Sequence, residues 1–398
     1  MPLIIKPKVL LPRKSINMEK WSVIACDQFT SEPEYWDTLK SLVDNIPSTY
    51  HLILPEAYLA QGDMDVMIEK VNHNMNLYLR NNIFEEHEAF ILIDRKTPFV
   101  KRRLGLVIAI DLEEYQFEPG KTGRIRATEK TVPERIPPRV KIRENAPIEL
   151  PHVLVLVDDQ KDLIISELYK HKKNYELMYD FELNMNGGHI KGYKVADTDD
   201  IIKRIEGMST DISLIVGDGN HSLASAKVCW DNLKKNLEGC ERETHPARYA
   251  LVELISLYDE GLTFEPIHRV IFNARPDLTE GLKKILSGDN KLKLFIGNEE
   301  VIINAPNNPF ESIKTIQDYL DEYLKKNPGV EIDFIHGLKN TKEIVRKNKN
   351  SIGIEMPPLK RDLLLPYIRE NGVLPRKSFS LGEAEEKRYY LEGKKILK

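Results

Sequence analysis

Apolar and polar positions along the chain follow two repeats, one typical of helices and one typical of strands. Helical spacing occurs at Tyr35, Leu39, Leu42 and Val43, behind an expected N-cap at Ser31, and again over residues 64–83. Short continuous apolar runs at residues 90–95, 103–112 and 153–157 are typical of buried strands. This mixture predicts an α+β (mixed α/β) protein with a mixed sheet.

The middle of the chain adds sharper local signals. Residues 175–195 predict a hairpin that turns at Asn186-Gly187-Gly188. Residues 198–206 predict a capped helix, and residues 212–216 predict another buried strand. Residues 116–150 instead contain five prolines and many charges. They predict a long segment without regular structure, which is usually either disordered or functional.

Towards the end of the chain, Lys, Asn and Glu become more frequent. Two strand-like runs within residues 292–303 precede a helical pattern over residues 309–326. We therefore expect two parts: residues 1–280 form the core with an N-terminal α/β part, and residues 281–398 form a smaller C-terminal α/β part that packs on it.

Charge and cysteine content limit the classes of function. The 398 residues include 58 Lys and Arg against 62 Asp and Glu, a net charge of −4, which argues against a nucleic-acid partner. Three cysteines without paired spacing fit neither a disulfide scaffold nor a zinc site. Because no membrane-length apolar run or signal-peptide pattern occurs, we expect a cytoplasmic protein without a membrane partner.

The strongest chemical signal follows the buried strand at residues 212–216 and reads Gly217-Asp218-Gly219-Asn220-His221-Ser222. A helical pattern over residues 223–237 comes next, so the turn offers helix N–H groups and a dipole that favour a phosphate. Asp218 can hold Mg²⁺ or a ligand hydroxyl, and His221 can donate to a phosphate or move a proton. The alternative is a tight turn in which Asp218 and Asn220 only cap the helix.

A second candidate lies in residues 123–135, where cations, carboxylates and hydroxyls alternate without an apolar face. Arg126 can bind a phosphate through two N–H groups, and Glu129 can act as a general base or a metal ligand. Thr131 adds a hydroxyl to the same stretch. The alternative is a solvated charged loop.

Two weaker candidates remain. His268 and Arg269 interrupt an apolar strand and point to opposite faces, so at most one of them faces a given site. The alternative for His268 is a core histidine with satisfied hydrogen bonds. Cys26-Asp27-Gln28 follows the first short apolar run, where a free Cys is more often a small buried hydrophobe than a nucleophile.

Three of these stretches together resemble the domain-of-unknown-function 1015 family (DUF1015): residues 126–131, 216–222 and 266–269. Members typically carry Arg-Pro-His-Glu-x-Thr and Asp-Gly-His-His-Arg in the first two places. Residues 374–384 resemble one branch of the family, and the resemblance covers nearly the whole chain. It implies a ParB/sulfiredoxin-like core, a fold found also in kinases that phosphorylate free L-serine with ADP or ATP.

The resemblance also implies roles for residues. It places a nucleotide phosphate at residues 217–222 and Asp218 near the metal or the acceptor hydroxyl, with Arg126 and Glu129 on the facing half of the site. The chain departs from the family pattern at Asn220 and Ser222, which replace a His and an Arg, and at Ala127 and Thr128, which replace a Pro and a His. The positive charge lost at Ser222 is available from Arg124, Arg126 or Arg269.

These observations predict a nucleotide-dependent phosphotransfer enzyme, a small-molecule kinase that acts on a hydroxyl-bearing metabolite such as free serine and uses Mg²⁺ with ATP or ADP. The expected catalytic residues are Asp218, His221 and Glu129, with Asp218 also the metal ligand. The expected phosphate-binding residues are Gly217, Gly219, Asn220, Ser222, Arg126, Thr131 and Arg269. The alternative is a nucleotide-sensing or protein-interaction module without catalysis, and a homo-oligomer is compatible with either.

Overall fold

A computed structural model of the chain describes residues 2–59, 62–118, 120–208 and 211–397, which form two compact units. The first unit comprises Met1–Ala127, Thr131–Leu262 and Glu383–Lys398, and the second comprises Thr128–Lys130 and Thr263–Gly382. This division differs from the expected one at residue 281. The reason is that β15 pairs with strands of the second unit, while the C-terminal segment pairs with strands of the first.

A mixed sheet forms the centre of the first unit, and it has ten strands in the described residues, in the order β11-β12-β5-β6-β14-β10-β13-β8-β7 with β1 on β6. The pairs β10–β14, β13–β8 and β7–β8 are parallel, and the others are antiparallel. The predicted mixed α/β class is therefore confirmed. The strands are β1 (Ile4–Ile5), β5 (Phe90–Lys96), β6 (Arg103–Asp111), β7 (Tyr115–Gln116), β8 (Ile125–Ala127), β10 (Leu154–Val157), β11 (Glu176–Leu183), β12 (Gly188–Val195), β13 (Leu214–Asp218) and β14 (Tyr249–Ser256).

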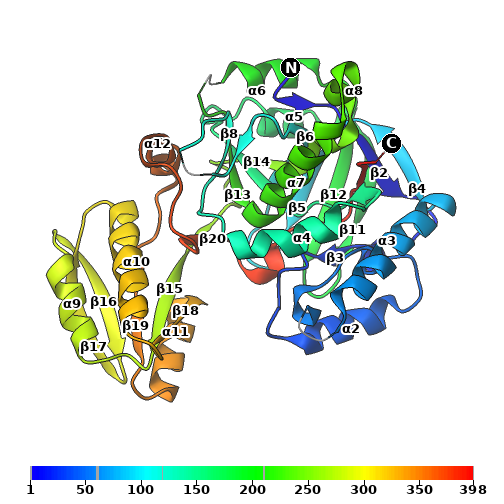
Figure 1. The fold of residues 1–398 in the computed structure, drawn as a ribbon. Coiled ribbons are helices and arrows are strands. Elements are labelled where there is room, and N and C mark those ends of the chain that lie inside the picture. Colours follow the sequence, from blue (N-terminus) through cyan, green and yellow to red (C-terminus); the bar gives the residue numbers. More distant parts are fainter. Residues whose placement is uncertain (1, 60–61, 119, 209–210, 398) are drawn as a thin grey trace. The chain divides into compact units, whose positions relative to one another are not determined.

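Helices cover both faces of this sheet, because successive residues of a strand point to opposite sides. Ile91 and Ile93 pack with α1, α2 and α3, whereas Phe90 and Leu92 share a core with α5, α6 and α7. In Figure 1, α4 and α7 run close together in front of the sheet. The helices are α1 (Met18–Trp21), α2 (Pro33–Val43), α3 (Met64–Arg80), α4 (Ile136–Arg143), α5 (Ile165–Lys170), α6 (Asp199–Gly207), α7 (Asn220–Leu233) and α8 (Gly239–Thr244).

The expectation that residues 116–150 lack regular structure is wrong, because much of this segment forms helices and strands. It contains β8, the short 3₁₀ helix η3 (Pro133–Arg135), α4 and β9 (Ile148–Glu149). Pro137 and Pro138 lie at the start of α4, where the missing N–H group breaks no helical hydrogen bond. The prolines that suggested an irregular segment therefore begin a helix, and its packing against α7 stabilises it.

The second unit contains a sheet of its own, with six described strands in the order β17-β16-β19-β15-β18 and β20 paired with β15. Helix α10 has the predicted bounds, and helix α11 packs against the sheet. The strands are β15 (Phe264–Phe272), β16 (Asn290–Ile296), β17 (Glu299–Ala305), β18 (Glu331–His336), β19 (Ile352–Ile354) and β20 (Phe379–Leu381). The helices are α9 (Asp277–Ile285), α10 (Pro309–Lys326), α11 (Leu338–Lys347) and α12 (Arg361–Asn371).

The C-terminal segment is bound into the first unit by strand pairs and buried charges. β21 (Tyr389–Tyr390) pairs with β3 (Val23–Ile24), and β22 (Lys394–Lys395) pairs with β9. Arg388 directly precedes β21 and is 3% exposed, and it donates to the carboxylates of Glu253 and Glu392, which are 3% and 1% exposed. Burial alone lowers the pKa of Arg388, but the two carboxylates raise it above its usual value. The guanidinium therefore stays charged inside the protein.

We expect Arg388→Met to destabilise the first unit strongly. The substitution leaves the carboxylates of Glu253 and Glu392 buried without a cation, a change that costs about 3–5 kcal/mol in comparable buried pairs. Denaturant unfolding followed by circular dichroism measures the loss. Lys395→Met, which removes an exposed cation, is the matched control and should change stability by less than about 1 kcal/mol. Equal stability of the two variants would contradict this interpretation of the Arg388 network.

Candidate functional site

The turn between β13 and α7 is shaped by two glycines. Opposite β10, the register shifts so that Val216 pairs with Val155 and Asp218 pairs with Leu154. Gly217 is thus the extra residue of a bulge, a feature that redirects the side chain that follows it. Gly219 caps α7 with φ of +80°, and a Cβ atom there would lie 3.1 Å from the Cα atom of Val153. The left-handed φ and the close approach of Val153 explain why position 219 is a glycine.

Asp218 and His221 are held on opposite sides of this glycine. Asp218 Oδ1 accepts the N–H of Gly219 at 2.9 Å, and Oδ2 lies 3.0 Å from Nζ of Lys387. His221 Nε2 accepts the backbone N–H of Val132 at 3.1 Å, so the neutral imidazole carries its proton on Nδ1. The end of β13 thus pairs a carboxylate with an ammonium group, and the first turn of α7 adds an imidazole.

The remaining residues predicted for the first unit lie on the neighbouring elements. Asn220 and Ser222 form the first turn of α7 with His221, and all three are half-buried. The hydroxyl of Thr131 is buried and has no hydrogen-bond partner among the described residues. Arg126 lies on β8, next to β13, and donates to the carbonyl of Gly123 at 3.1 Å and to Asp211 at 3.0 Å. These two bonds tie the Arg126 guanidinium to the chain just before β8 and just before β13.

Glu129 belongs to the second unit, where its carboxylate binds backbone. It accepts the N–H groups of Ser378 at 2.8 Å, Lys377 at 3.1 Å and Phe379 at 3.4 Å. Burial raises the pKa of Glu129, although Lys377 and the three N–H groups act in the opposite direction. Its neighbours Thr128 and Lys130 hydrogen-bond to Leu374. Glu129 therefore joins the Thr128–Lys130 segment to the chain that precedes and enters β20.

His268 and Arg269 also lie in the second unit, on β15, and both are buried. His268 Nδ1 accepts the N–H of Met356 at 3.1 Å, and burial together with the nearby charge of Arg269 lowers its pKa to about 4. Arg269 donates to Gln317 at 3.1 Å and lies over the ring of Phe334, while burial lowers its pKa to about 10. His268 is thus a neutral core histidine.

A further polar group in the first unit is linked to the β13–α7 turn. Asp27 follows β3, and the N–H of Ala25 donates to the carbonyl of Arg388, the residue after Lys387. The hydroxyl of Tyr390 lies 2.8 Å from His152 Nδ1 and 3.1 Å from the sulfur of Cys26. His152 Nε2 lies 3.9 Å from Asp27 Oδ2, and the next residue, Val153, packs against Gly219. Contacts and chain connections therefore form a closed ring. Asp218 contacts Lys387, the chain continues to Tyr390, Tyr390 contacts His152, and the adjacent Val153 packs against Gly219.

The two carboxylates at this ring remain open to solvent, whereas Lys387 and His152 are buried. Asp27 and Asp218 each keep 28% of their side-chain surface exposed. Burial opposes ionisation of Asp27, yet His152, a hydrogen bond from Gln28 and the cations Arg139 and Lys387 hold its pKa below the usual value. In the sequence, Asp27 belongs to the weakest of the candidate stretches, and His152, Lys387 and Tyr390 belong to none. Only the position of Asp27 after a short buried run offered a signal.

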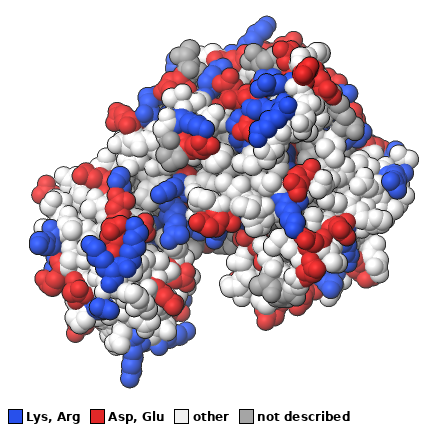
Figure 2. All heavy atoms as spheres, viewed as in Figure 1, with Lys and Arg blue, Asp and Glu red and all other residues white. Residues whose placement is uncertain are grey.

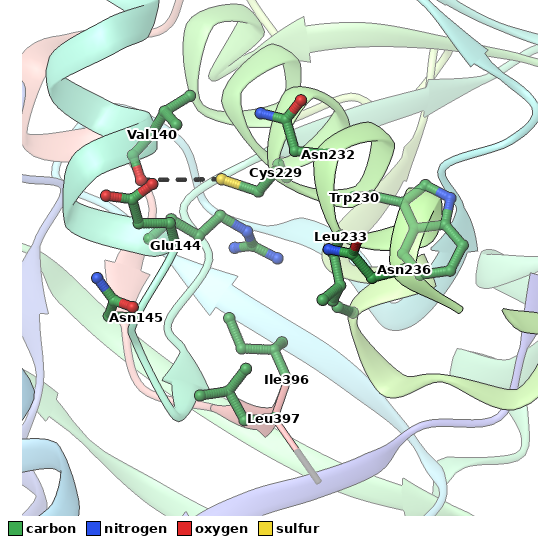
Figure 3. Close-up of a pocket in the computed structure, with 13 residues that line it drawn as sticks. Val140, Glu144, Asn145, Cys229, Trp230, Asn232, Leu233, Asn236, Ile396 and Leu397 are labelled. Atoms are coloured by element: carbon green, nitrogen blue, oxygen red, sulfur yellow. Dashed lines mark hydrogen bonds between the residues drawn. The ribbon is translucent and has the colours of Figure 1, made fainter. Parts of the chain in front are cut away.

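A separate hollow lies further along α7, away from the turn (Figure 3). Its volume is about 280 Å³, and α4, the second half of α7 and the residues near the C-terminus line it. The thiol of Cys229 points to the carbonyl of Val140 at 3.8 Å, with Trp230 and Leu233 on the same side. Apolar side chains form most of the wall, and Arg143 and Glu144 add one charge of each sign on the α4 side.

No group of three or more His, Cys, Asp or Glu side chains among the described residues is arranged to hold a metal ion. No described helix has the length and apolar character required to cross a membrane. On the face drawn in Figure 2, basic and acidic side chains lie interspersed.

The chain belongs to the family described as "Protein of unknown function (DUF1015)", whose model matches residues 10–347. No curated protein matches it. Among solved structures, it is similar to a conserved hypothetical protein from Pyrococcus furiosus (TM-score 0.34, 11% identity, 72% of this chain and 90% of that one). It is also similar to SbnI from Staphylococcus aureus with a C-terminal truncation (0.39, 9%, 69% and 82%) and to a free serine kinase in complex with AMP (0.38, 10%, 71% and 98%).

We expect Cys26 to react slowly with thiol reagents. Burial and the charge of Asp27 raise the pKa of Cys26 to about 11, so roughly one molecule in a thousand carries the thiolate at pH 8. Iodoacetamide should modify the exposed Cys240 long before Cys26, as measured by peptide mass spectrometry. Guanidinium-unfolded protein is the control, in which both should react at similar rates. Equal rates in the folded protein would contradict the packing described for Cys26.

Proposed function

We propose that this chain is a nucleotide-dependent phosphotransfer enzyme that binds a nucleotide phosphate at the β13–α7 turn and transfers a phosphoryl group to a hydroxyl of a small molecule such as free serine. The observation that carries the proposal is the left-handed Gly219, which caps a 14-residue helix directly after a bulged, buried strand. Such a helix start favours an anion through its dipole and its backbone donors.

Positive charge and hydrogen-bond donors around the turn suit a phosphate. Phosphoryl transfer depends on positioning and on neutralising charge on the phosphate oxygens. The ammonium of Lys387 lies at the turn, and His221 lies in the first turn of α7. The buried hydroxyl of Thr131, next to the N–H that His221 binds, lacks a partner among the described residues and would gain one from a phosphate oxygen. Arg126, on the neighbouring strand, is a further candidate contact.

Mg²⁺ fits this proposal through Asp218. Mg²⁺ retains several waters and usually takes only one or two protein carboxylates beside substrate phosphates, so a single Asp at the end of β13 suffices. The carboxylate is 28% exposed, and its Oδ2 atom now contacts a cation that a metal ion would replace. When bound, Mg²⁺ supplies charge neutralisation between the phosphates.

The sequence resemblance supports a finer version of the proposal, in which the first unit has a ParB/sulfiredoxin-like core and the free-serine kinases are its functional relatives. Membership of a family of unknown function leaves the reaction open. The replacement of the family's His and Arg by Asn220 and Ser222 favours a second candidate, a module that binds nucleotide without transferring phosphate. The experiment below separates the two, because only an enzyme forms a phosphorylated product.

We expect ATP or ADP with Mg²⁺ to raise the unfolding temperature of the protein. A ligand that binds only the folded state at 100 times its Kd adds about 2.7 kcal/mol of stability. Asp218→Asn should weaken this shift and abolish turnover without unfolding the protein, because it removes the carboxylate at the turn. Differential scanning fluorimetry measures binding, and ³¹P NMR with L-serine as the acceptor measures transfer.

Asp44→Asn, an exposed Asp at the end of α2, is the matched control and should behave as the wild type. A shift without any phosphorylated product would favour the non-catalytic module. An unchanged unfolding temperature with every nucleotide would contradict the proposed phosphate site.

A further inference from the structure

A second carboxylate, that of Asp27, lies beside the ring of contacts at the β13–α7 turn and has no role in the phosphate site. Asp218 contacts Lys387 directly, and Asp27 is tied to the same segment by the hydrogen bond from Ala25 to Arg388. Both carboxylates are open to solvent to the same extent, 28% of each side chain. Asp27 is therefore accessible to a small molecule bound beside the turn.

Hydrogen bonds fix how His152 faces this carboxylate. The oxygen of Tyr390 accepts the backbone N–H of Cys26 at 3.3 Å, so its own proton is available for an acceptor. The sulfur of Cys26, at 3.1 Å, and His152 Nδ1, at 2.8 Å, compete for that proton. Because sulfur is a weak acceptor, we assign the proton to His152 Nδ1, which leaves the imidazole proton on Nε2. Nε2 lies 3.9 Å from Asp27 Oδ2, a separation too long for a direct hydrogen bond and suited to a bridging hydroxyl or water.

We propose that Asp27 is the catalytic residue that accepts the proton of the substrate hydroxyl, with His152 and Tyr390 as positioning residues; this inference rests on the proposed function. The hydroxyl oxygen of the acceptor attacks the terminal phosphorus of the nucleotide, and its proton passes to Asp27 Oδ2. The bond from that phosphorus to the bridging oxygen breaks, and its electron pair leaves with the nucleotide, as ADP from ATP or as AMP from ADP. Asp27 then releases the proton to water.

The two predicted carboxylates differ in their suitability for this step. Glu129, the base predicted from the sequence, already accepts three backbone N–H groups within the second unit. Asp27 accepts one side-chain donor, from Gln28 at 3.0 Å. The titratable and charged groups that face Asp27 are His152, Arg139 with its partner Glu56, Lys387 and the thiol of Cys26. Their combined effect lowers its pKa, so Asp27 is ionised at neutral pH.

The test compares Asp27→Asn with Asp44→Asn in the full chain. We expect Asp27→Asn to keep the nucleotide-induced rise in unfolding temperature and to lower kcat for transfer to L-serine by about 10²–10⁴-fold, the usual contribution of a general base. His152→Gln should lower kcat less and leave KM for the nucleotide unchanged. Since His152 acts through its orientation, Tyr390→Phe should also lower kcat, and ¹⁵N NMR should show that His152 loses its fixed Nε2–H tautomer.

Each outcome decides between the two proposals. If the wild type binds nucleotide and forms product while Asp27→Asn matches it, the role of Asp27 is overturned and the proposed function stands. If Asp27→Asn also loses the nucleotide-induced shift, Asp27 serves binding or folding, which again overturns its role as the base. If the wild type neither binds nucleotide nor forms product, the proposed function fails and the role of Asp27 fails with it.

Discussion

The buried contacts of Arg388 with Glu253 and Glu392 are the constraint on which the rest of the first unit depends. A guanidinium and two carboxylates removed from water are tolerated only when they bind one another with good geometry. Glu253 lies on a central strand and fits there because it faces Gly105, where any side chain would overlap its carboxylate. The C-terminal segment must therefore return to this one point in the sheet.

That return also builds the candidate site. Lys387 and Tyr390 flank Arg388 in the chain, so fixing Arg388 places the ammonium at Asp218 and the phenol at His152. The structural cation and the functional groups thus share one short segment. Polar groups that perform chemistry are held best on elements whose own position is set by packing, and here buried charge provides that setting.

Local patterns predicted much of the fold, because they depend on neighbours in the sequence. Periodicity and turn residues predicted the hairpin at Asn186, the helix Pro309–Lys326 and the strand–turn–helix around Gly219. The ring around the turn was not, because it joins distant residues: Tyr390 is 238 positions from His152 and 364 from Cys26. Glu129 is the opposite case. Its sequence motif suggested a catalytic role, but in the structure its carboxylate accepts backbone N–H groups, such as that of Ser378.

The order in which the chain is synthesised gives the C-terminal return a further consequence. Translation proceeds from the N-terminus, and domains generally fold as their residues emerge. The whole segment Thr263–Gly382, which forms nearly all of the second unit, is made before Arg388. Until then the first unit has a buried Glu253 without its cation and a β13–α7 turn without Lys387. In the nascent chain, nearly all residues of the second unit are therefore present before Lys387 is added to the first unit. The candidate site is among the last parts of the protein to be completed.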